Sequence, residues 1–288
     1  MGDRFWILSC WRCTFRETGS ICLLNLVYAA PSPTLADYVS AFYLFDTDEP
    51  SFSDIERADI AQLRFSLRGS GDITFGPNDT QPFSAVTLIG PRMKASTLRV
   101  TGPAICFGMG LLPAGWCALT GLPANQYANR VVDAQDRING DVFALREAMA
   151  ASGCFEDMVA ASERFVAEAV AKAETPPFRL IRAVDAWLEA SMDPDIGDLA
   201  EKTGLSAAQL QRQLKATYGA SPKLLARKYR ALKTAVRIAN GDGVWQDYVG
   251  DTYYDQSHCI REIKAFTGVT PEAIRKTPRL TKATFERH

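Results

Sequence analysis

Histidine is the residue type that this chain most lacks. Only two of its 288 residues are histidines, His258 and His288. The residues before His258 therefore hold no imidazole for Cys–His or Ser–His–Asp catalysis, or for the metal of a β-barrel oxygenase. The sequence also lacks a G-x-S-x-G nucleophile motif and a Walker phosphate-binding loop. We therefore expect neither an enzyme nor a bound metal or cofactor.

Long apolar runs are missing as well. Arg12, Arg16 and Glu17 interrupt the N-terminal region, so no run approaches the roughly 18 apolar residues of a membrane-spanning helix. The run over residues 21–30 has the length of a signal-peptide core, but acidic residues precede it. We expect residues 1–33 to be a poorly ordered extension and the protein to have no membrane partner.

The cysteines do not form the pattern of a disulfide framework. The seven cysteines are an odd number, are scattered along a large chain, and favour a reducing compartment such as the cytoplasm. Cys10 and Cys13 form a C-x-x-C motif, but no second motif or nearby histidine completes a zinc site. A redox-responsive regulator that uses Cys10 and Cys13, or Cys106 and Cys117, stays open as an alternative.

The net charge of −1 conceals an uneven distribution. Residues 178–288 contain 18 Lys and Arg against 13 Asp and Glu, a net charge of +5. Residues 1–177 contain 14 against 20, a net charge of −6. A basic C-terminal part is typical of a protein that binds nucleic acid or another anionic surface.

Short apolar segments separated by turn residues characterise residues 34–151. Residues 63–67 alternate strictly between apolar and polar side chains, which predicts a half-buried strand, and the run Gly69-Ser70-Gly71-Asp72 predicts its end. Further strands are expected at residues 73–75, 85–89, 97–100 and 104–109. This spacing predicts a β-rich domain, either a cupin-like antiparallel barrel or a sandwich.

Helical periodicity begins after Asp133. Residues 142–151 and 155–173 are rich in Ala and Glu and repeat apolar residues at helical spacing. Thr175-Pro176-Pro177 then ends the second helix, because tandem proline cannot continue it. We place a domain boundary there and expect helices at residues 178–191, 195–203, 206–218 and 223–240, and a final pair after Val244.

Residues 195–214 predict a helix-turn-helix unit. The first helix has a short apolar stripe that includes Leu199, Gly204 suits a left-handed turn, and Ser206 suits the N-cap of the second helix. That second helix would bury Leu210 and Leu214. It would expose Ala207, Ala208, Gln211 and Arg212 near its start. Outward Gln and Arg at this place can read base edges in the major groove, so double-stranded DNA is the expected partner.

The segments that follow carry a resemblance to a known family. Gly219-Ala220-Ser221-Pro222 precedes a basic helix, and residues 255–271 read Asp-Gln-Ser-His-Cys-Ile-Arg-Glu-Ile-Lys-Ala-Phe-Thr-Gly-Val-Thr-Pro. In this order, residues 178–276 closely resemble the DNA-binding part of the AraC/XylS family of transcription regulators. The resemblance implies an all-α domain in which a long helix joins two helix-turn-helix units, and hence an α+β protein overall.

A weaker resemblance covers residues 35–151, with Gly108–Trp116 as its most distinctive run. It implies a sensor or dimerisation domain that binds a small-molecule effector or forms a homodimer. The expected division is an extension (1–33), a sensor domain (34–151), a helical linker (152–177) and a DNA-binding domain (178–288). RNA polymerase would be a further partner if the protein activates transcription.

The resemblance also implies roles for single residues. The base-reading positions are Ala208, Gln211 and Arg212 in the first unit and Gln256, Ser257, Ile260 and Arg261 in the second. Phosphate contacts are expected from Ser206, Lys223, Arg227, Lys228, Arg230, Lys233 and His258. His258 has no cluster of ligands around it, so a metal or catalytic role is not expected.

The second unit departs from the family pattern. Asp247-Tyr248 replaces an Ile-Ala or Leu-Ala pair, and Thr252 replaces a turn glycine. A bulky Tyr would separate the two helices, and Thr in a left-handed turn costs about 1 kcal/mol or more. Alternatively, Trp245 is the anchor and the register shifts by one residue.

Cys259 and Ile263 replace residues that are usually bulky and aromatic, which predicts an underfilled core in the second unit. These departures support a second hypothesis. In it, the second unit is degenerate and the protein acts as a sensor or antagonist through protein contacts.

Overall fold

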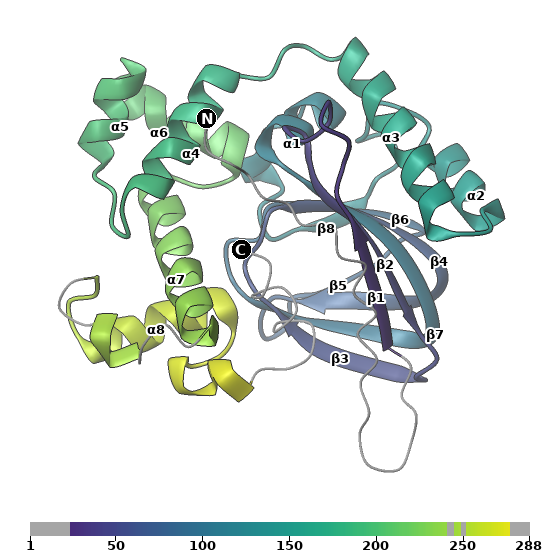
Figure 1. Cartoon of the computed structure of the whole chain (residues 1–288), viewed down its shortest axis with the longest axis horizontal. Coiled ribbons are helices and arrows are strands. Elements are labelled where there is room, and N and C mark those ends of the chain that lie inside the picture. The colour runs from purple at the N-terminus through teal and green to yellow at the C-terminus, as the bar shows by residue number, and fades with distance from the viewer. Residues whose placement is uncertain (1–23, 241–244, 249–251, 277–288) are drawn as a thin grey trace.

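The computed structural model describes residues 24–240, 245–248 and 252–276 and shows a β-rich domain beside a helical domain (Figure 1). The predicted α+β class is confirmed. One antiparallel sheet contains the strands β1 (Leu24–Ala29), β2 (Val39–Thr47), β3 (Ser51–Glu56), β4 (Ala61–Thr74), β5 (Thr80–Pro82), β6 (Val86–Ile89), β7 (Ser96–Leu111) and β8 (Val131–Asp133). Its order is β1-β2-β7-β4-β6-β8, with β3 paired to β7 and β5 to β4.

The alternation along β4 divides the sheet into two faces. Leu63 and Phe65 are fully buried in the main apolar core, on the face that three helices cover. Gln62 and Arg64 point to the opposite, concave face, where they line a cavity. The polar half of the predicted alternation is therefore not solvated, since Arg64 is only 6% exposed.

Two strands run through residues that the sequence predicts as breaks. β4 continues across Gly69-Ser70-Gly71-Asp72, with irregular pairing to β7 between Ser66 and Ser70. β7 joins the strands predicted at residues 97–100 and 104–109 into one of 16 residues. The predicted ends are wrong because bulges let a long strand bend without losing its partners.

The extension expected at residues 1–33 is too long by at least one strand. Leu24–Ala29 forms β1, which pairs with β2 from Leu24 opposite Thr47 to Ala29 opposite Phe42. Residues 1–23, which include Cys10 and Cys13, lie outside the described part of the chain.

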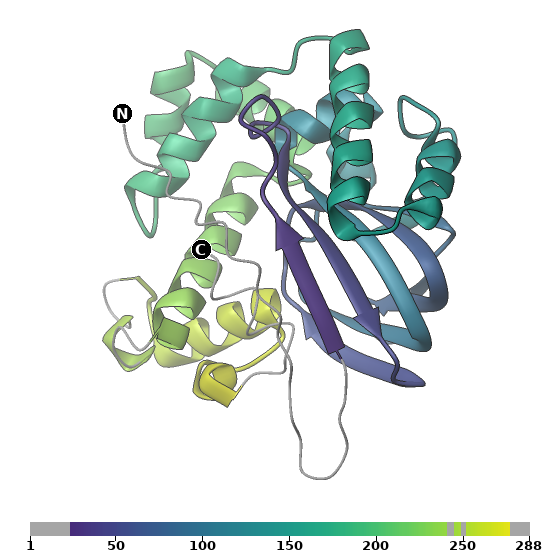
Figure 2. The same ribbon diagram turned by 45° about the vertical axis from the view of Figure 1, so that its right-hand side comes forward.

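Three helices cover the convex face of the sheet: α1 (Pro113–Thr120), α2 (Val142–Ala151) and α3 (Phe155–Lys172). The bounds of α2 match the prediction, and Asp141 caps its start by accepting from the amides of Phe143 and Ala144. α3 was expected in a linker, but Met158 and Val166 are buried in the same core as Phe65. It is therefore part of the β-rich domain, as Figure 2 shows.

The helical domain contains α4 (Phe178–Ala190), α5 (Ile196–Thr203), α6 (Ala207–Tyr218), α7 (Pro222–Asn240) and α8 (Gln256–Thr267), with the 3-10 helices η2 (Trp245–Tyr248) and η3 (Pro271–Lys276). A third 3-10 helix, η1 (Ala124–Gln126), belongs to the β-rich domain. The helices predicted at residues 178–191, 195–203, 206–218 and 223–240 are confirmed to within one residue. The long helix α7 leads from the group α4 to α6 down to α8 (Figure 1).

The domains are in direct contact. α7 lies beside the concave side of the sheet in both views (Figures 1 and 2), and its Lys228 donates to the carbonyl of Asp59 at 2.7 Å. Within the described ranges, none of the helices combines the length and hydropathy needed to cross a bilayer.

Candidate functional site

The first helix-turn-helix unit has the local geometry that its sequence predicts. Gly204 adopts φ 69° and its amide closes α5 onto the carbonyls of Ala200 and Glu201. Ser206 then caps α6, since its hydroxyl accepts from the amide of Gln209 while the Gln209 side chain accepts from the amide of Ser206. Leu210 and Leu214 are fully buried. These contacts fix the direction in which α6 leaves the turn.

The start of α6 is exposed and its end is covered. Ala208, Gln211 and Arg212 are all exposed, as predicted. At the other end, a Cβ on Gly219 would lie 3.3 Å from the carbonyl of Ala124 in the β-rich domain. The first turns of α6 therefore face away from the sheet. This N-terminal end is the one that reads bases in helix-turn-helix proteins.

α8 repeats this arrangement. Asp255 caps it by accepting from the amide of His258 at 2.7 Å. The predicted base-reading residues Gln256, Ser257 and Arg261 are exposed, and Ile260 is half-buried. Tyr254, just before the cap, is 91% exposed. The first turns of α8 are thus accessible, like those of α6.

The predicted phosphate contacts divide into two groups. Ser206 and Lys223 are exposed, whereas Arg227 and His258 are half-buried and Lys233 donates to the carbonyl of Leu188. Arg227 bonds Glu262 at 2.7 Å, and His258 Nε2 lies 3.4 Å from the same carboxylate. These five residues keep some exposure, and their contact with phosphate stays a prediction.

The expectation is wrong for Lys228 and Arg230, which do not lie on an open helix face. Lys228 is 3% exposed and bonds the β-rich domain. Arg230 is 7% exposed and joins Glu262 of α8, at 2.7 Å, to Asp193 before α5, at 2.6 Å. Both cations are held inside the protein by partners far away in the sequence.

The core of the second unit is filled in a way that the sequence did not indicate. Cys259 and Ile263 are fully buried, as expected, beside Phe266 and Tyr253. Ala58 of the β-rich domain completes this cluster. Where the first helix of the unit is expected, the described residues 245–248 form the 3-10 helix η2. Residues 249–251 lie outside the described part of the chain. The alternative in which the register shifts by one residue is therefore not tested.

A cavity of about 320 Å³ lies between the concave face of the sheet and α7. Its walls are mainly apolar and aromatic. Five basic and two acidic residues also line it: Arg57, Arg64, Arg68, Arg92, Lys228, Glu56 and Asp59. The cavity is therefore shared by the two domains, because Lys228, Tyr229 and Leu232 belong to α7.

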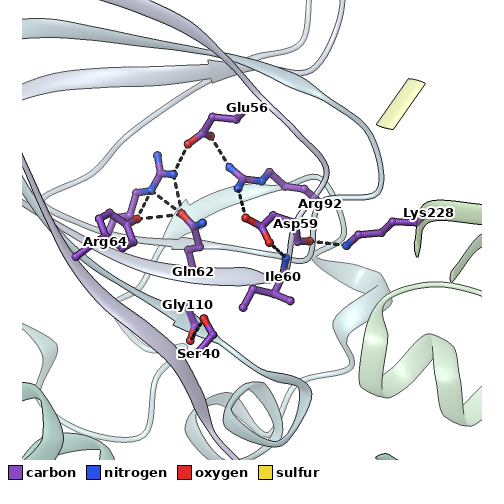
Figure 3. A network of polar contacts seen from close by, with 10 residues as sticks. Ser40, Glu56, Asp59, Ile60, Gln62, Arg64, Arg92, Gly110 and Lys228 are labelled. Atoms are coloured by element: carbon purple, nitrogen blue, oxygen red, sulfur yellow. Dashed lines mark hydrogen bonds and ion pairs between the residues drawn. The ribbon is translucent and has the colours of Figure 1, made fainter. Parts of the chain in front are cut away.

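Five of the seven charged residues of the cavity form one network (Figure 3): Glu56, Asp59, Arg64, Arg92 and Lys228. Glu56 bridges Arg64, at 2.6 Å, and Arg92. Arg92 also reaches Asp59 at 3.5 Å, while its Nε has no hydrogen-bond partner among the described residues. Tyr43 accepts from Arg64 at 2.9 Å. Gly108 makes room for this tyrosine, since a Cβ there would lie 2.2 Å from its ring.

Charge and burial shift the pKa values of this network. Burial opposes ionisation of Asp59, but Arg57, Arg92 and Lys228 outweigh it and lower the pKa of Asp59 to about 2. Burial lowers the pKa of Lys228 to about 7, and Arg57 and Arg92 add to this effect against Asp59. The cavity thus concentrates more positive than negative charge in a poorly hydrated place.

Sequence reasoning missed Arg57, Arg64 and Arg92. For Arg64 the available signal was the strict alternation at residues 63–67, which places polar side chains on one face without saying what that face encloses. The cysteine alternative gains no support here, because burial raises the pKa of Cys106 to about 11 and also raises that of Cys117. A thiol that stays protonated is a poor nucleophile. The described residues contain no group of three or more side chains that could bind a metal.

Two family models match the chain. Residues 199–277 match a model described as a helix-turn-helix domain. Residues 28–133 match a model described as a domain of unknown function, DUF6597. No curated protein sequence matches the chain.

Several solved structures match the chain at low sequence identity, with TM-scores below 0.5. Apo ToxT K231A from Vibrio cholerae strain SCE256 is 11% identical with a TM-score of 0.44, over 91% of this chain and 100% of that one. Wild-type ToxT from the same strain with a bound unsaturated fatty acid is 9% identical, with a TM-score of 0.40, over 90% and 97%. The AraC-like transcriptional activator CuxR is 11% identical, with a TM-score of 0.27, over 74% and 87%.

Proposed function

We propose that the chain is a transcription regulator of the AraC type, which its sequence resembles, and that it binds specific sequences of double-stranded DNA through α6 and α8. The match of residues 199–277 to a helix-turn-helix model supports this proposal. The observation that carries this proposal is the shared design of these helices. Each has a capped, exposed N-terminal end that bears polar side chains, and each ends against the β-rich domain. Two such helices fit successive major-groove segments, roughly 34 Å apart along one face of the duplex.

Arg212 tests the base-reading role, because it is exposed and carries a side chain that can pair with guanine. Specific sites are first selected from a pool of random duplexes with the wild-type protein. Replacing Arg212 with Ala should then weaken binding to a selected site by about 1 to 3 kcal/mol and relax the preference at one base pair. Binding to random DNA should change much less.

The matched control is Arg164→Ala, an exposed arginine on α3 in the β-rich domain. It removes the same charge at a place remote from α6 and α8, and should leave binding to the selected site unchanged. An equal loss on selected and random DNA in the Arg212 variant would contradict base reading, since a phosphate contact acts on every sequence.

A second candidate function follows from η2. If this four-residue 3-10 helix does not support α8 on DNA, the protein would act as a sensor or antagonist through protein contacts. The same selection separates the two functions. Two sequence elements about one helical turn apart favour the double reader. A single element with a shallow salt dependence, which reports few phosphate contacts, favours the degenerate second unit.

For the cavity, we propose an effector that is mainly apolar and carries one anionic group. The volume of about 320 Å³ lies within the range of small-molecule sites. The lining supports the charge of the ligand, because basic residues outnumber acidic ones five to two and Arg92 Nε is unpartnered among the described residues. A second copy of the chain and RNA polymerase stay expected partners.

A pair of probes with the same chain and different head groups tests the effector class. Oleate and oleyl alcohol should be compared by equilibrium dialysis against the full chain. We expect oleate to bind at least about tenfold more tightly, because hydrogen bonds to a charged group contribute roughly 1.5–3 kcal/mol. Equal binding of the two probes would show that the basic groups do not face the ligand.

A further inference from the structure

The β-rich domain contacts the C-terminal end of α8 through two backbone hydrogen bonds. The amide of Ala58 donates to the carbonyl of Phe266 at 2.6 Å, and the amide of Ala95 donates to the carbonyl of Ala265 at 2.9 Å. Carbonyls in the last turn of a helix have no partner within the helix. The other domain supplies those partners here, and Ala58 is fully buried among the core residues of α8.

The two donor segments form one unit. The amide of Asp59 donates to the carbonyl of Arg92 at 3.2 Å, and the amide of Arg92 donates back at 3.0 Å. We call Ile55, Ala58 and Ala95 the α8 clamp. Because Arg92 and Asp59 also line the cavity, the α8 clamp is directly attached to the walls of the cavity.

The same sensor segment contacts the first unit. Pro91 lies beside Gly219 at the end of α6, where a Cβ would be 3.2 Å from its Cγ. Met93 is 7% exposed and is buried in the core that contains Leu210 and Leu214. A single stretch from Pro91 to Ala95 therefore contacts both units whose helices carry the predicted base-reading residues.

Gly268 is matched to the α8 clamp. It ends α8 with φ 80°, and a Cβ there would lie 2.3 Å from Ile55 Cγ2 and 3.2 Å from Ala95 Cβ. Gly204 ends α5 with a similar φ of 69°, but a Cβ there would meet nothing within 4 Å. Both glycines have a positive φ, which other residues rarely adopt. Only at Gly268 would a side chain also collide with the β-rich domain.

We propose that the α8 clamp positions the second reading helix, so that α6 and α8 meet DNA in a fixed mutual placement. This inference rests on the proposed DNA binding. In this role the β-rich domain is a structural part of the second DNA reader, besides carrying the cavity. Breaking the clamp should remove reading by α8 while α6 continues to read.

Three variants of the full chain test the role of the clamp. Gly268→Ala introduces both the backbone strain and the clash with Ile55. Gly204→Ala introduces only the backbone strain, so it is the matched control. Gly268→Ala combined with Ile55→Ala keeps the strain and removes the atom at 2.3 Å, so it should restore the clamp.

Hydrogen exchange of the Ala58 and Ala95 amides reports on the clamp without DNA. Gly268→Ala should accelerate exchange of both amides by about tenfold or more, whereas Gly204→Ala and the double variant should resemble the wild type. Far-UV circular dichroism confirms that each variant is folded. Equal exchange in the Gly268 and Gly204 variants would overturn the proposed clamp.

Selection from random duplexes reports on positioning. The wild type and the double variant should each recover two elements, and Gly268→Ala only the element read by α6. Its affinity for two-element sites should fall by about tenfold to hundredfold. If Gly268→Ala accelerated exchange of the clamp amides but still recovered two DNA elements, the positioning role would be overturned. No motif from the wild type would remove the DNA function and this role together, while the exchange result would still decide whether the clamp exists.

Discussion

Glu262 is the fully buried carboxylate at the centre of the helical domain. Its side chain is 0% exposed and accepts from Arg227 and Arg230, both at 2.7 Å. Arg230 in turn reaches Asp193, whose side chain is 66% exposed. One carboxylate on α8 therefore compensates two guanidinium groups on α7, and through Arg230 it is linked to the first helix-turn-helix unit.

Replacing Glu262 with Gln should destabilise the helical domain by about 3–5 kcal/mol, because a buried guanidinium loses its compensating charge while the shape is kept. The remaining partner, Asp193, is largely solvated and compensates weakly. Urea denaturation followed by circular dichroism measures the change. The control is Glu201→Gln on the exposed side of α5, which should stay within about 0.5 kcal/mol of the wild type. A similar loss in both variants would contradict the central role of Glu262.

At this scale the sequence predicted exposed residues well and buried charges poorly. Gln211, Arg212 and Gln256 lie on the surface as their helical positions indicate. Lys228 and Arg230 occupy positions on a basic helix that look equally polar. Their partners lie 169 and 32 residues away, at Asp59 and Glu262. No local pattern contains information on such a pairing.

Among the elements, helices were predicted more accurately than strands for a physical reason. A helix closes its hydrogen bonds within itself, so its caps and periodicity are local. Asp195, Ser206 and Gly204 lie where the sequence places them, at the ends of α5 and α6. The predicted bounds of these helices therefore agree with the structure.

A strand ends where its neighbours stop pairing, which local sequence does not report. β4 continues through Gly69 because β7 lies along its whole length. β2 and β3 were not predicted, although Phe42 and Phe52 are buried in them. The cavity was not predicted either, because its walls come from several strands and from α7, whose pairing and packing local sequence does not report.

At the scale of the whole molecule, Lys228 is a charged side chain that crosses between the domains. Its ammonium group donates to the carbonyl of Asp59 at 2.7 Å while Arg57 and Arg92 are nearby. The carbonyl of Asp59 also accepts from the amide of Arg92 at 3.0 Å. If the lysine is replaced by an uncharged residue, the carbonyl of Asp59 therefore keeps one hydrogen bond. The change in stability then reports mainly the cost of burying the cation.

The pKa of Lys228 predicts a pH dependence of stability. Burial lowers it from the usual 10.5 to about 7 in the folded protein. Between pH 7 and 10.5 the unfolded chain therefore binds the proton and the folded chain does not, so stability rises with pH in this window. Below about pH 7 both states are protonated, and the full cost of the buried cation is present.

Replacing Lys228 with Met should consequently stabilise the protein most below about pH 7. The advantage should shrink above that pH by about 1.4 kcal/mol per unit. Urea denaturation of both proteins from about pH 6 to 8.5 measures the difference, below the range in which the raised pKa values of Cys106 and Cys259, about 11, become relevant. Lys223→Met, on the exposed side of the same helix, should show no such trend. If the Lys228→Met substitution instead weakened the protein equally at every pH, the lysine would be a stabilising cation. The lysine would then stay protonated throughout this pH range, and its pKa would not be lowered by burial.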